Sequence, residues 1–235
     1  MLFKTAISCI SGLRFKVKQL LLIFILILFT CGFSDIKQKD EYTCGPVCAA
    51  NCVINILSRS DSPQKLVKHF IKSAKTSKKG TTAQKLIKSI EIYLAKNHIK
   101  TDIKYYGIRH VEKNYQSPVP IDICDELQRG SSIILNLGFY SYKNGIFKRN
   151  GGHYVNANSC DGKKILISDP YAKHSSPFYI ELKSKPAGRI SNPIDNEKYN
   201  SIDYEYFAIS PDFDYLNPSE IVFLNGIIKI YPLYL

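Results

Sequence analysis

Cys44 has the sequence context of a reactive thiol. It is followed by Gly45 and Pro46, and proline within a helix is tolerated only in the first turn, so a helix is expected to begin at about Cys44. The partial positive charge and unpaired N–H groups at a helix N-terminus stabilise a thiolate. Gly45 allows a substrate to approach closely, and the backbone N–H of Cys44 could bind a developing oxyanion. The pattern indicates that Cys44 is a nucleophile.

His153 and Asp169 are predicted to lie together at the open end of a hairpin. His153 follows a glycine pair and begins an alternating apolar strand, and Asp169 ends the next strand. Asp161-Gly162 is a turn signal between the two strands. The free ends of a hairpin's arms lie side by side, so the Asp169 carboxylate is expected to accept one imidazole proton and fix the tautomer. The other ring nitrogen of His153 would then face the thiol as general base.

A second interpretation concerns the cysteines alone. Cys44, Cys48 and Cys52 recur at intervals of four residues, which places them near one helix face and raises the question of a metal site. One helix cannot close a tetrahedron with three consecutive ligands, and no CxxC pair is present, so no metal is expected. Cys48 and Cys52 are interpreted as small buried residues.

These residues together resemble a known enzyme clan. Gln38, Cys44-Gly45-Pro46, Gly152-His153-Tyr154-Val155 and Asp169-Pro170 resemble the papain-like cysteine peptidases, and within them the bacteriocin-processing peptidases that cleave after double-glycine leaders, with their stand-alone relatives. The resemblance covers about residues 36–172. It implies a papain-like fold without a cofactor, with Cys44 as nucleophile, His153 as base and Asp169 orienting it. It also implies that Gln38 contributes to the oxyanion hole beside Cys44.

The sequence departs from that family in three ways. The stretch between Cys44 and His153 is long, residues of about 175–235 have no counterpart, and no transporter or ATPase domain follows. The leader-export role is therefore not expected to carry over. The motif supports thiol chemistry on an acyl group without fixing the substrate.

The elements that must position these residues follow an α+β order. Apolar periodicity and end signals predict helices at 44–57, 63–74, 82–95 and 121–129. Alternation and apolar runs predict strands at 101–106, 131–140, 153–159, 164–168, 179–182, 204–210 and 221–231. Residues 183–203 are expected to form a surface loop. Helices followed by an antiparallel sheet predict an N-terminal helical part, carrying the nucleophile at a helix N-terminus, packed on the sheet that carries the histidine and aspartate.

The N-terminus is typical of an exported protein. Four basic residues and no acidic ones precede an apolar run from Leu20 to Phe29, which is too short for a comfortable membrane span and typical of a signal peptide. Cys31 follows directly, as in a bacterial lipoprotein signal, although Phe29 and Thr30 are unusual there. Whether Cys31 is lipidated stays open. The predicted domains are a signal in residues 1–31 and a peptidase domain in residues 32–235 with a C-terminal strand extension, in a periplasmic, membrane-anchored or secreted protein.

Composition limits the function classes further. The 235 residues carry a net charge of +12, which favours anionic partners. Nucleic acid is not expected, because no Arg-rich cluster or zinc-finger spacing occurs, and the Lys-rich stretch 68–79 is interpreted as a solvated surface. Five cysteines follow the signal segment, an odd number that leaves at least one free thiol. The sequence leaves open whether Cys124 and Cys160 pair, and it does not predict the oligomeric state.

The sequence therefore predicts an exported peptidase or amidase that hydrolyses a peptide or isopeptide bond through an acyl-enzyme. Its expected partners are a peptide or protein substrate and, through the N-terminus, a membrane. Two alternatives stay open. One is an acyltransferase or transglutaminase-type enzyme, or a secreted effector, that uses the same residues. The other is a non-catalytic binding module on a protease scaffold.

Overall fold

The computed structural model describes residues 36–57, 62–107, 109–111, 114–116, 121–171, 177–190, 202–209 and 219–233. The chain divides into two units, Met1–Ser34 and Asp35–Leu235, and all described residues belong to the second unit. The predicted signal in residues 1–31, including Cys31, lies outside the described residues. No helix in the described ranges is long and apolar enough to cross a membrane.

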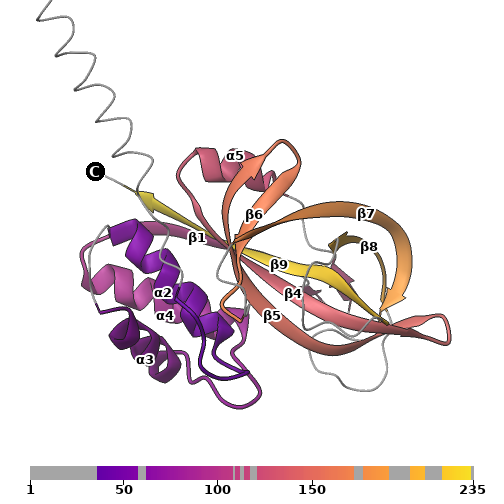
Figure 1. Cartoon of the computed structure of the whole chain (residues 1–235), viewed down its shortest axis with the longest axis horizontal. Helices are drawn as coiled ribbons and strands as arrows, with labels where there is room; N and C mark the ends of the chain where they lie inside the picture. The colour runs from indigo at the N-terminus through magenta and orange to yellow at the C-terminus, as the bar shows by residue number, and fades with distance from the viewer. Residues whose placement is uncertain are drawn as a thin grey trace, which may run out of the picture. The chain divides into compact units, whose positions relative to one another are not determined.

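The described helices follow the local signals in the sequence. They are α2 (Cys44–Leu57), α3 (Pro63–Ser73), α4 (Ala83–Lys96) and α5 (Ile123–Gln128). The Thr82 side chain accepts a hydrogen bond from the N–H of Lys85, and Asp122 does the same for the N–H of Asp125. Both are N-caps, and they satisfy donors that the first helical turn leaves unpaired. Figure 1 shows α2, α3 and α4 gathered on one side of the sheet.

The strands form one large sheet and one small one. In chain order they are β1 (Lys100–Gly107), β2 (Arg109–Val111), β3 (Asn114–Gln116), β4 (Ser132–Lys143), β5 (Ile146–Asp161), β6 (Lys164–Ser168), β7 (Phe178–Ile190), β8 (Ile202–Ile209) and β9 (Glu220–Leu233). The large sheet has the order β1-β9-β4-β5-β6-β7-β8, with β8 also pairing with β9. β2 and β3 pair with each other. Apart from a short parallel contact between β5 and β7, the neighbouring strands of the large sheet are antiparallel. The architecture is α+β, as predicted.

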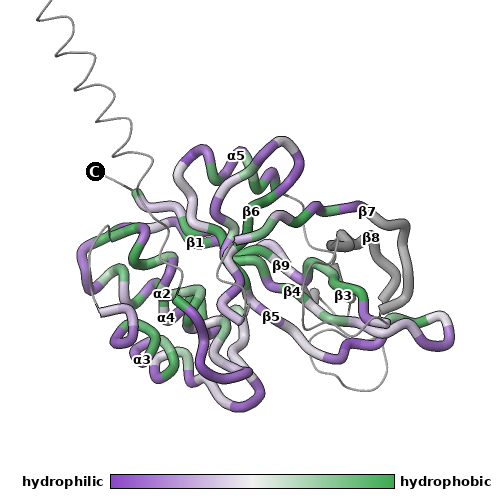
Figure 2. The backbone as a smooth tube through the Cα atoms, in the orientation of Figure 1, coloured by the Kyte–Doolittle hydropathy of each residue, from purple (hydrophilic) through white to green (hydrophobic). Residues whose placement is uncertain are grey.

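β4 is buried on both faces, which explains its continuous apolar run. Ile133, Leu135 and Leu137 point into the core that includes α5, while Ile134 points into the core beneath α2, α3 and α4. Side chains of a strand alternate between faces, so a strand covered on both sides carries a nearly continuous apolar run, which in β4 is interrupted by Asn136. Figure 2 shows hydrophobic stretches in both the helices and the strands, with hydrophilic stretches on the helices as well as in the loops.

One loop prediction is wrong in part. Residues 183–190 continue β7, and β8 begins at Ile202; residues 191–201 lie outside the described residues. The polar composition of 183–190 suggested a loop, but this stretch pairs with β8 and, at Arg189 and Ile190, with the start of β5. Long-range pairing thus outweighs local propensity here.

A disulfide joins Cys124 of α5 to Cys160 of β5. It fastens the short helix α5 to the sheet. Cys44, Cys48 and Cys52 are free thiols, and all three are buried.

Candidate active site

Cys44 stands at the first position of α2, where the sequence places it, and is 7% exposed. Gly45 beside it is packed against the ring of Tyr154: a Cβ on Gly45 would stand 3.3 Å from Tyr154 Cδ2. The Tyr154 hydroxyl donates to the carbonyl of Thr81 just before α4. Tyr154 therefore holds the start of α2 against the sheet and against the loop that leads into α4.

The edge of β5 beside Cys44 is open because β6 ends early. Pairing between these strands stops at Asn156 with Ser168. The backbone of Tyr154, beyond that point, hydrogen-bonds to α2: its N–H contributes to stabilising the Cys44 sulfur, and its carbonyl accepts from Cys48 Sγ at 3.2 Å. The first turn of α2 thus occupies the edge position that β6 vacates.

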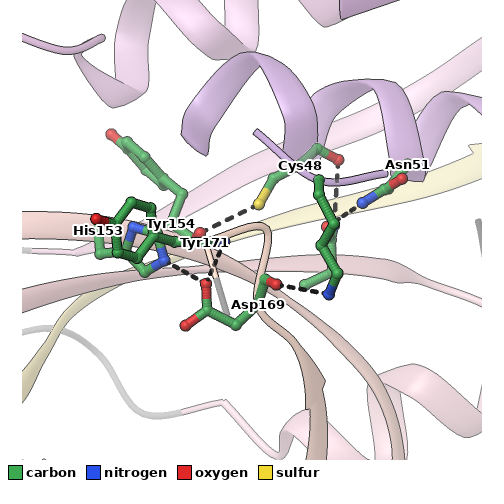
Figure 3. A network of polar contacts seen from close by, with 8 residues as sticks. Cys48, Asn51, His153, Tyr154, Asp169 and Tyr171 are labelled. Atoms are coloured by element: carbon green, nitrogen blue, oxygen red, sulfur yellow. Dashed lines mark hydrogen bonds and ion pairs between the residues drawn. The ribbon is translucent and has the colours of Figure 1, made fainter. Parts of the chain in front are cut away.

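His153 lies between Cys44 and Asp169, and is itself 6% exposed. Its Nε2 is 2.7 Å from Asp169 Oδ1, and the same oxygen accepts from the N–H of Tyr171 at 2.8 Å. Figure 3 shows both bonds converging on Asp169. Since Nε2 faces the carboxylate, Nδ1 is the nitrogen left for the thiol. The ring of Phe139 stacks beside the imidazole, with 6.3 Å between ring centroids.

The electrostatics favour a thiolate and an imidazolium. Burial raises the pKa of the Cys44 thiol, but the hydrogen bond and charge of His153, with the backbone N–H groups of Tyr154 and Gly45, lower it further, so it lies below its ordinary value. Burial lowers the pKa of His153, whereas hydrogen bonds to Asp169 and Cys44 raise it to about 10. An opposite charge and a hydrogen bond to the charged form have this effect on both partners.

The neighbouring cysteines behave differently although they share the helix. Burial raises the pKa of Cys48 well above its ordinary value and that of Cys52 to about 12. Neither has a histidine partner that offsets its desolvation. Within the described residues, no group of three or more histidine, cysteine or acidic side chains is arranged to hold a metal ion.

Gln38 lies near this cluster through its main chain. Its N–H donates to the carbonyl of Pro170 at 2.9 Å, and Lys37 Nζ donates to the carbonyl of Asp169 at 3.0 Å. The segment that leads into α2 is therefore tied to the residues at the end of β6. Gln38 Oε1 is buried and has no hydrogen-bond partner among the described residues.

Sequence reasoning missed the polar network that fixes α2 on β5. The Asn156 amide nitrogen donates to the carbonyl of Cys48 and to Cys52 Sγ, while its oxygen accepts from the Asn51 amide. Asn51 Oδ1 accepts in turn from the N–H of Ile36. Asn51 and Asn156 are both buried. A polar residue within each of two apolar segments was the available signal, because a buried amide has to be hydrogen-bonded.

A cavity of about 590 Å³ opens on one side of Cys44. Its walls come from the loop before α4 and the start of that helix, from the face of β4 and β5 that carries Tyr154, and from Asn225 of β9. Its size is that of a small-ligand or peptide subsite. The sequence did not reveal it, because its walls come from segments that are far apart in the chain.

A family described as the Peptidase_C39 like family matches residues 31–203 of this chain. The chain belongs to this family. The match includes all of Gln38, Cys44, His153 and Asp169, and it supports a papain-like cysteine peptidase, as the sequence resemblance implied.

Among solved structures, the chain is similar to the peptidase domain of Streptococcus ComA, a bi-functional ABC transporter involved in a quorum-sensing pathway. Identity is 17%, with 63% of this chain and 85% of that chain covered and a TM-score of 0.39. It is also similar to a C39-like peptidase from Bacillus anthracis, at 12% identity, with 62% and 83% covered and a TM-score of 0.39. These scores are too low to add to the assignment, which rests on the family match. No curated protein matches the chain.

Proposed function

We propose that the chain is an exported thiol peptidase or amidase that hydrolyses a peptide or isopeptide bond through Cys44, His153 and Asp169. The supporting observation is the position of one imidazole between a lowered-pKa thiol and a buried carboxylate. A structural histidine would need only one of these partners. Here Asp169 accepts a hydrogen bond from one ring nitrogen, and the other nitrogen is placed to take the proton of the thiol. This is the arrangement of a general base that is oriented by an acid.

The chemical steps follow from this arrangement. The Cys44 thiolate attacks the carbonyl carbon, forming a C–S bond while the carbonyl electrons move onto oxygen. The His153 imidazolium then gives its proton to the leaving nitrogen, the C–N bond breaks, and a thioester remains on Cys44. Water attacks this thioester as His153 takes one of its protons, and the products are a carboxylic acid and the restored thiolate.

The oxyanion formed in each step needs donors. The backbone N–H of Cys44 at the helix start is one, and the side-chain amide of Gln38 is the second. The carbonyl of Pro170 holds the Gln38 backbone beside the site, and the carbonyl of Asp169 holds the neighbouring Lys37 side chain. Because Gln38 Oε1 has no partner in the described structure, no hydrogen bond to that oxygen opposes a rotation of the amide that presents its N–H₂ to the oxyanion.

Export also belongs to the proposal. Residues 1–31 are proposed to direct the chain out of the cytoplasm, with Cys31 as the lipidation candidate. Expression in a bacterium fed a labelled fatty acid would test both points. A labelled, processed wild-type chain and an unlabelled Cys31→Ala variant support lipidation. Processing without label supports simple cleavage, and an unprocessed cytoplasmic chain overturns export.

Alkylation of the full chain by iodoacetamide at pH 7, with labelled sites mapped by mass spectrometry, tests the thiol site. Cys44 should react at least tenfold faster than Cys48 or Cys52, which are buried on the same helix without a histidine partner. The rate at Cys44 should fall in His153→Ala. Equal rates at the three cysteines, unchanged in His153→Ala, would show a non-catalytic scaffold. Incubation with peptides then separates hydrolysis from acyl transfer, because only transfer consumes an added amine.

A further inference from the structure

The cavity beside Cys44 is strongly basic. The charged side chains that line it are four basic ones and a single acidic one, Lys78, Lys79, Lys85, Arg149 and Glu41. These five side chains give the lining of the cavity an excess of three positive charges. A cleft lined by one sign of charge raises the local concentration of ligands of the opposite sign.

The three lysines come from one corner of the cavity. Lys78 and Lys79 are in the exposed loop before α4, and Lys85 is in the first turn of that helix. None of the three forms an ion pair with a described residue. A loop of this composition on the solvent side of a cavity can direct its charge toward a bound group without first breaking an internal salt bridge.

A β-bulge brings Arg149 to the opposite wall. The pairing of β4 with β5 shifts after Phe139, so that Tyr140 faces Arg149 and Asn150 has no partner residue. The extra residue turns Arg149 to the face that carries Tyr154, the face of the cavity. Its Nε donates to the carbonyl of Gly151 at 3.1 Å. The guanidinium lies over Gly152, where any side chain would collide with Nη2.

A second bulge supplies a neutral donor. The pairing of β4 with β9 shifts at Asn225, which is buried and lines the cavity. The Tyr140 hydroxyl donates to Asn225 Oδ1 at 3.0 Å, so the hydrogen-bonding group that Asn225 has left is its N–H₂. That amide lies over Gly138, which a Cβ would obstruct. Gly138 and Gly152 are direct partners across β4 and β5, and together they make the recess that holds both donors.

We propose that this cavity is the subsite for a carboxylate of the substrate, next to the bond that Cys44 attacks. The inference rests on the proposed function, because it places the carboxylate relative to the Cys44 sulfur. Basic side chains and an amide N–H₂ group are the donors that a carboxylate accepts from. The carboxylate can come from an aspartate or glutamate side chain of the substrate or from a free C-terminus, and the recognition chemistry is the same for both.

The test compares two reagents that differ in charge and react with the same sulfur. Iodoacetate carries a carboxylate and iodoacetamide does not, so the ratio of their rates at Cys44 measures the field in the cavity. The full chain would be compared with the triple variant Lys78→Gln, Lys79→Gln, Lys85→Gln. Its matched control is Lys65→Gln, Lys68→Gln, Lys72→Gln, which removes the same charge from exposed positions on α3 outside the cavity.

We expect the iodoacetate to iodoacetamide ratio to fall about tenfold in the cavity variant at low salt and less than twofold in the α3 control. Equal ratios in the two variants would overturn the subsite while leaving the thiol site intact. Slow labelling of Cys44 by both reagents, with no dependence on His153, would overturn the proposed function and the subsite with it.

Protection experiments then identify the source of the carboxylate. Short peptides that carry a glutamate with an amidated C-terminus, or a free C-terminus without acidic side chains, would compete with iodoacetamide at Cys44. A glutamine-containing amidated peptide is the neutral control. The peptide that protects at the lowest concentration identifies a side-chain or a C-terminal carboxylate, and best protection by the neutral peptide would contradict the proposal.

Discussion

Replacing Asp169 by asparagine isolates the effect of its negative charge on His153. Asparagine has the same shape and retains the oxygen that accepts from His153 Nε2 and from the N–H of Tyr171. Both hydrogen bonds therefore survive, and what disappears is the charge that stabilises the imidazolium. Since Asp169 is 2% exposed, solvent screens that charge little.

The size of the effect follows from the pKa of His153. A pKa of about 10 against an ordinary value of 6.5 corresponds to about 5 kcal/mol in favour of the imidazolium, at 1.36 kcal/mol for each tenfold. Asp169 and Cys44 share this stabilisation. If Asp169 supplies about 2 kcal/mol of it, the pKa of His153 falls by about 1.5 in Asp169→Asn, and the thiolate–imidazolium form loses up to about 30-fold relative to the neutral pair.

The assay is a titration of the histidine ring by NMR between pH 6 and 10.5, with the His153 signal identified by its loss in His153→Gln. Alkylation of Cys44 by iodoacetamide at pH 7 gives a second measure and should slow in Asp169→Asn by up to about 30-fold. A His153 pKa that changes by less than about 0.5 in the variant, with alkylation unchanged, would refute the reasoning. The backbone N–H groups at the start of α2 would then be sufficient to hold the thiolate.

Three further predictions concern stability. The raised pKa of His153 contributes stability that is complete below pH 6.5 and lost as the pH rises through about 10, while the lowered pKa of Cys44 contributes stability that is complete above pH 9.0 and lost as the pH falls. The free energy of unfolding in urea would be compared at each pH with that of a Cys44→Ser, His153→Gln variant. The difference should stay flat up to pH 9, where the two opposite pH dependences cancel, and should decrease from pH 9 to 10. A steady rise through this range would contradict the prediction. The disulfide between α5 and β5 closes a loop of 36 residues, so reducing it should lower the free energy of unfolding by roughly 3–4 kcal/mol. Alkylation of Cys44 should not slow. An unchanged melting temperature would show that the bond adds no stability. Gly138→Ala should lower the melting temperature by several degrees, because the added Cβ collides with the buried Asn225 amide. Gly151→Ala on the paired strand is the control, since its Cβ makes only ordinary contacts. Equal melting temperatures for the two variants would argue against the recess.

Local signals predicted the parts of the site that depend on neighbours in the chain. The helix start at Cys44 followed from Pro46, and the turn between β5 and β6 followed from Asp161 and Gly162, where Gly162 has a positive φ. The contact between His153 and Asp169 was also predicted, although it is not a direct strand pair. Pairing ends at Asn156 with Ser168, so Asp169 reaches the imidazole diagonally from beyond its strand.

Features that depend on distant segments could not be predicted in the same way. Nothing in Thr101 to Tyr106 indicates that this strand pairs with residues near 230. A pattern that alternates every two residues cannot reveal the two bulges on either side of β4, because each bulge reverses which residues face which side. In β9, Leu224 faces one core and Ile228 the other, although residues four apart in a regular strand share a face. Arg149 and Asn225 therefore could not be assigned to a face, and the cavity beside Cys44 could not be foreseen.

The position of β9 has a consequence for how the chain is made. β9 is inserted between β1 and β4, yet it is synthesised more than 110 residues after β1. Until Glu220 to Leu233 has left the ribosome, β1 has no strand to pair with, and one edge of β4 presents unpaired backbone groups. A nascent or truncated chain that ends before β9 holds Cys44, His153 and Asp169 on an unfinished sheet. Such a chain should be a target for chaperones and proteases, and the arrangement of Cys44, His153 and Asp169 should become stable only after β9 has been synthesised.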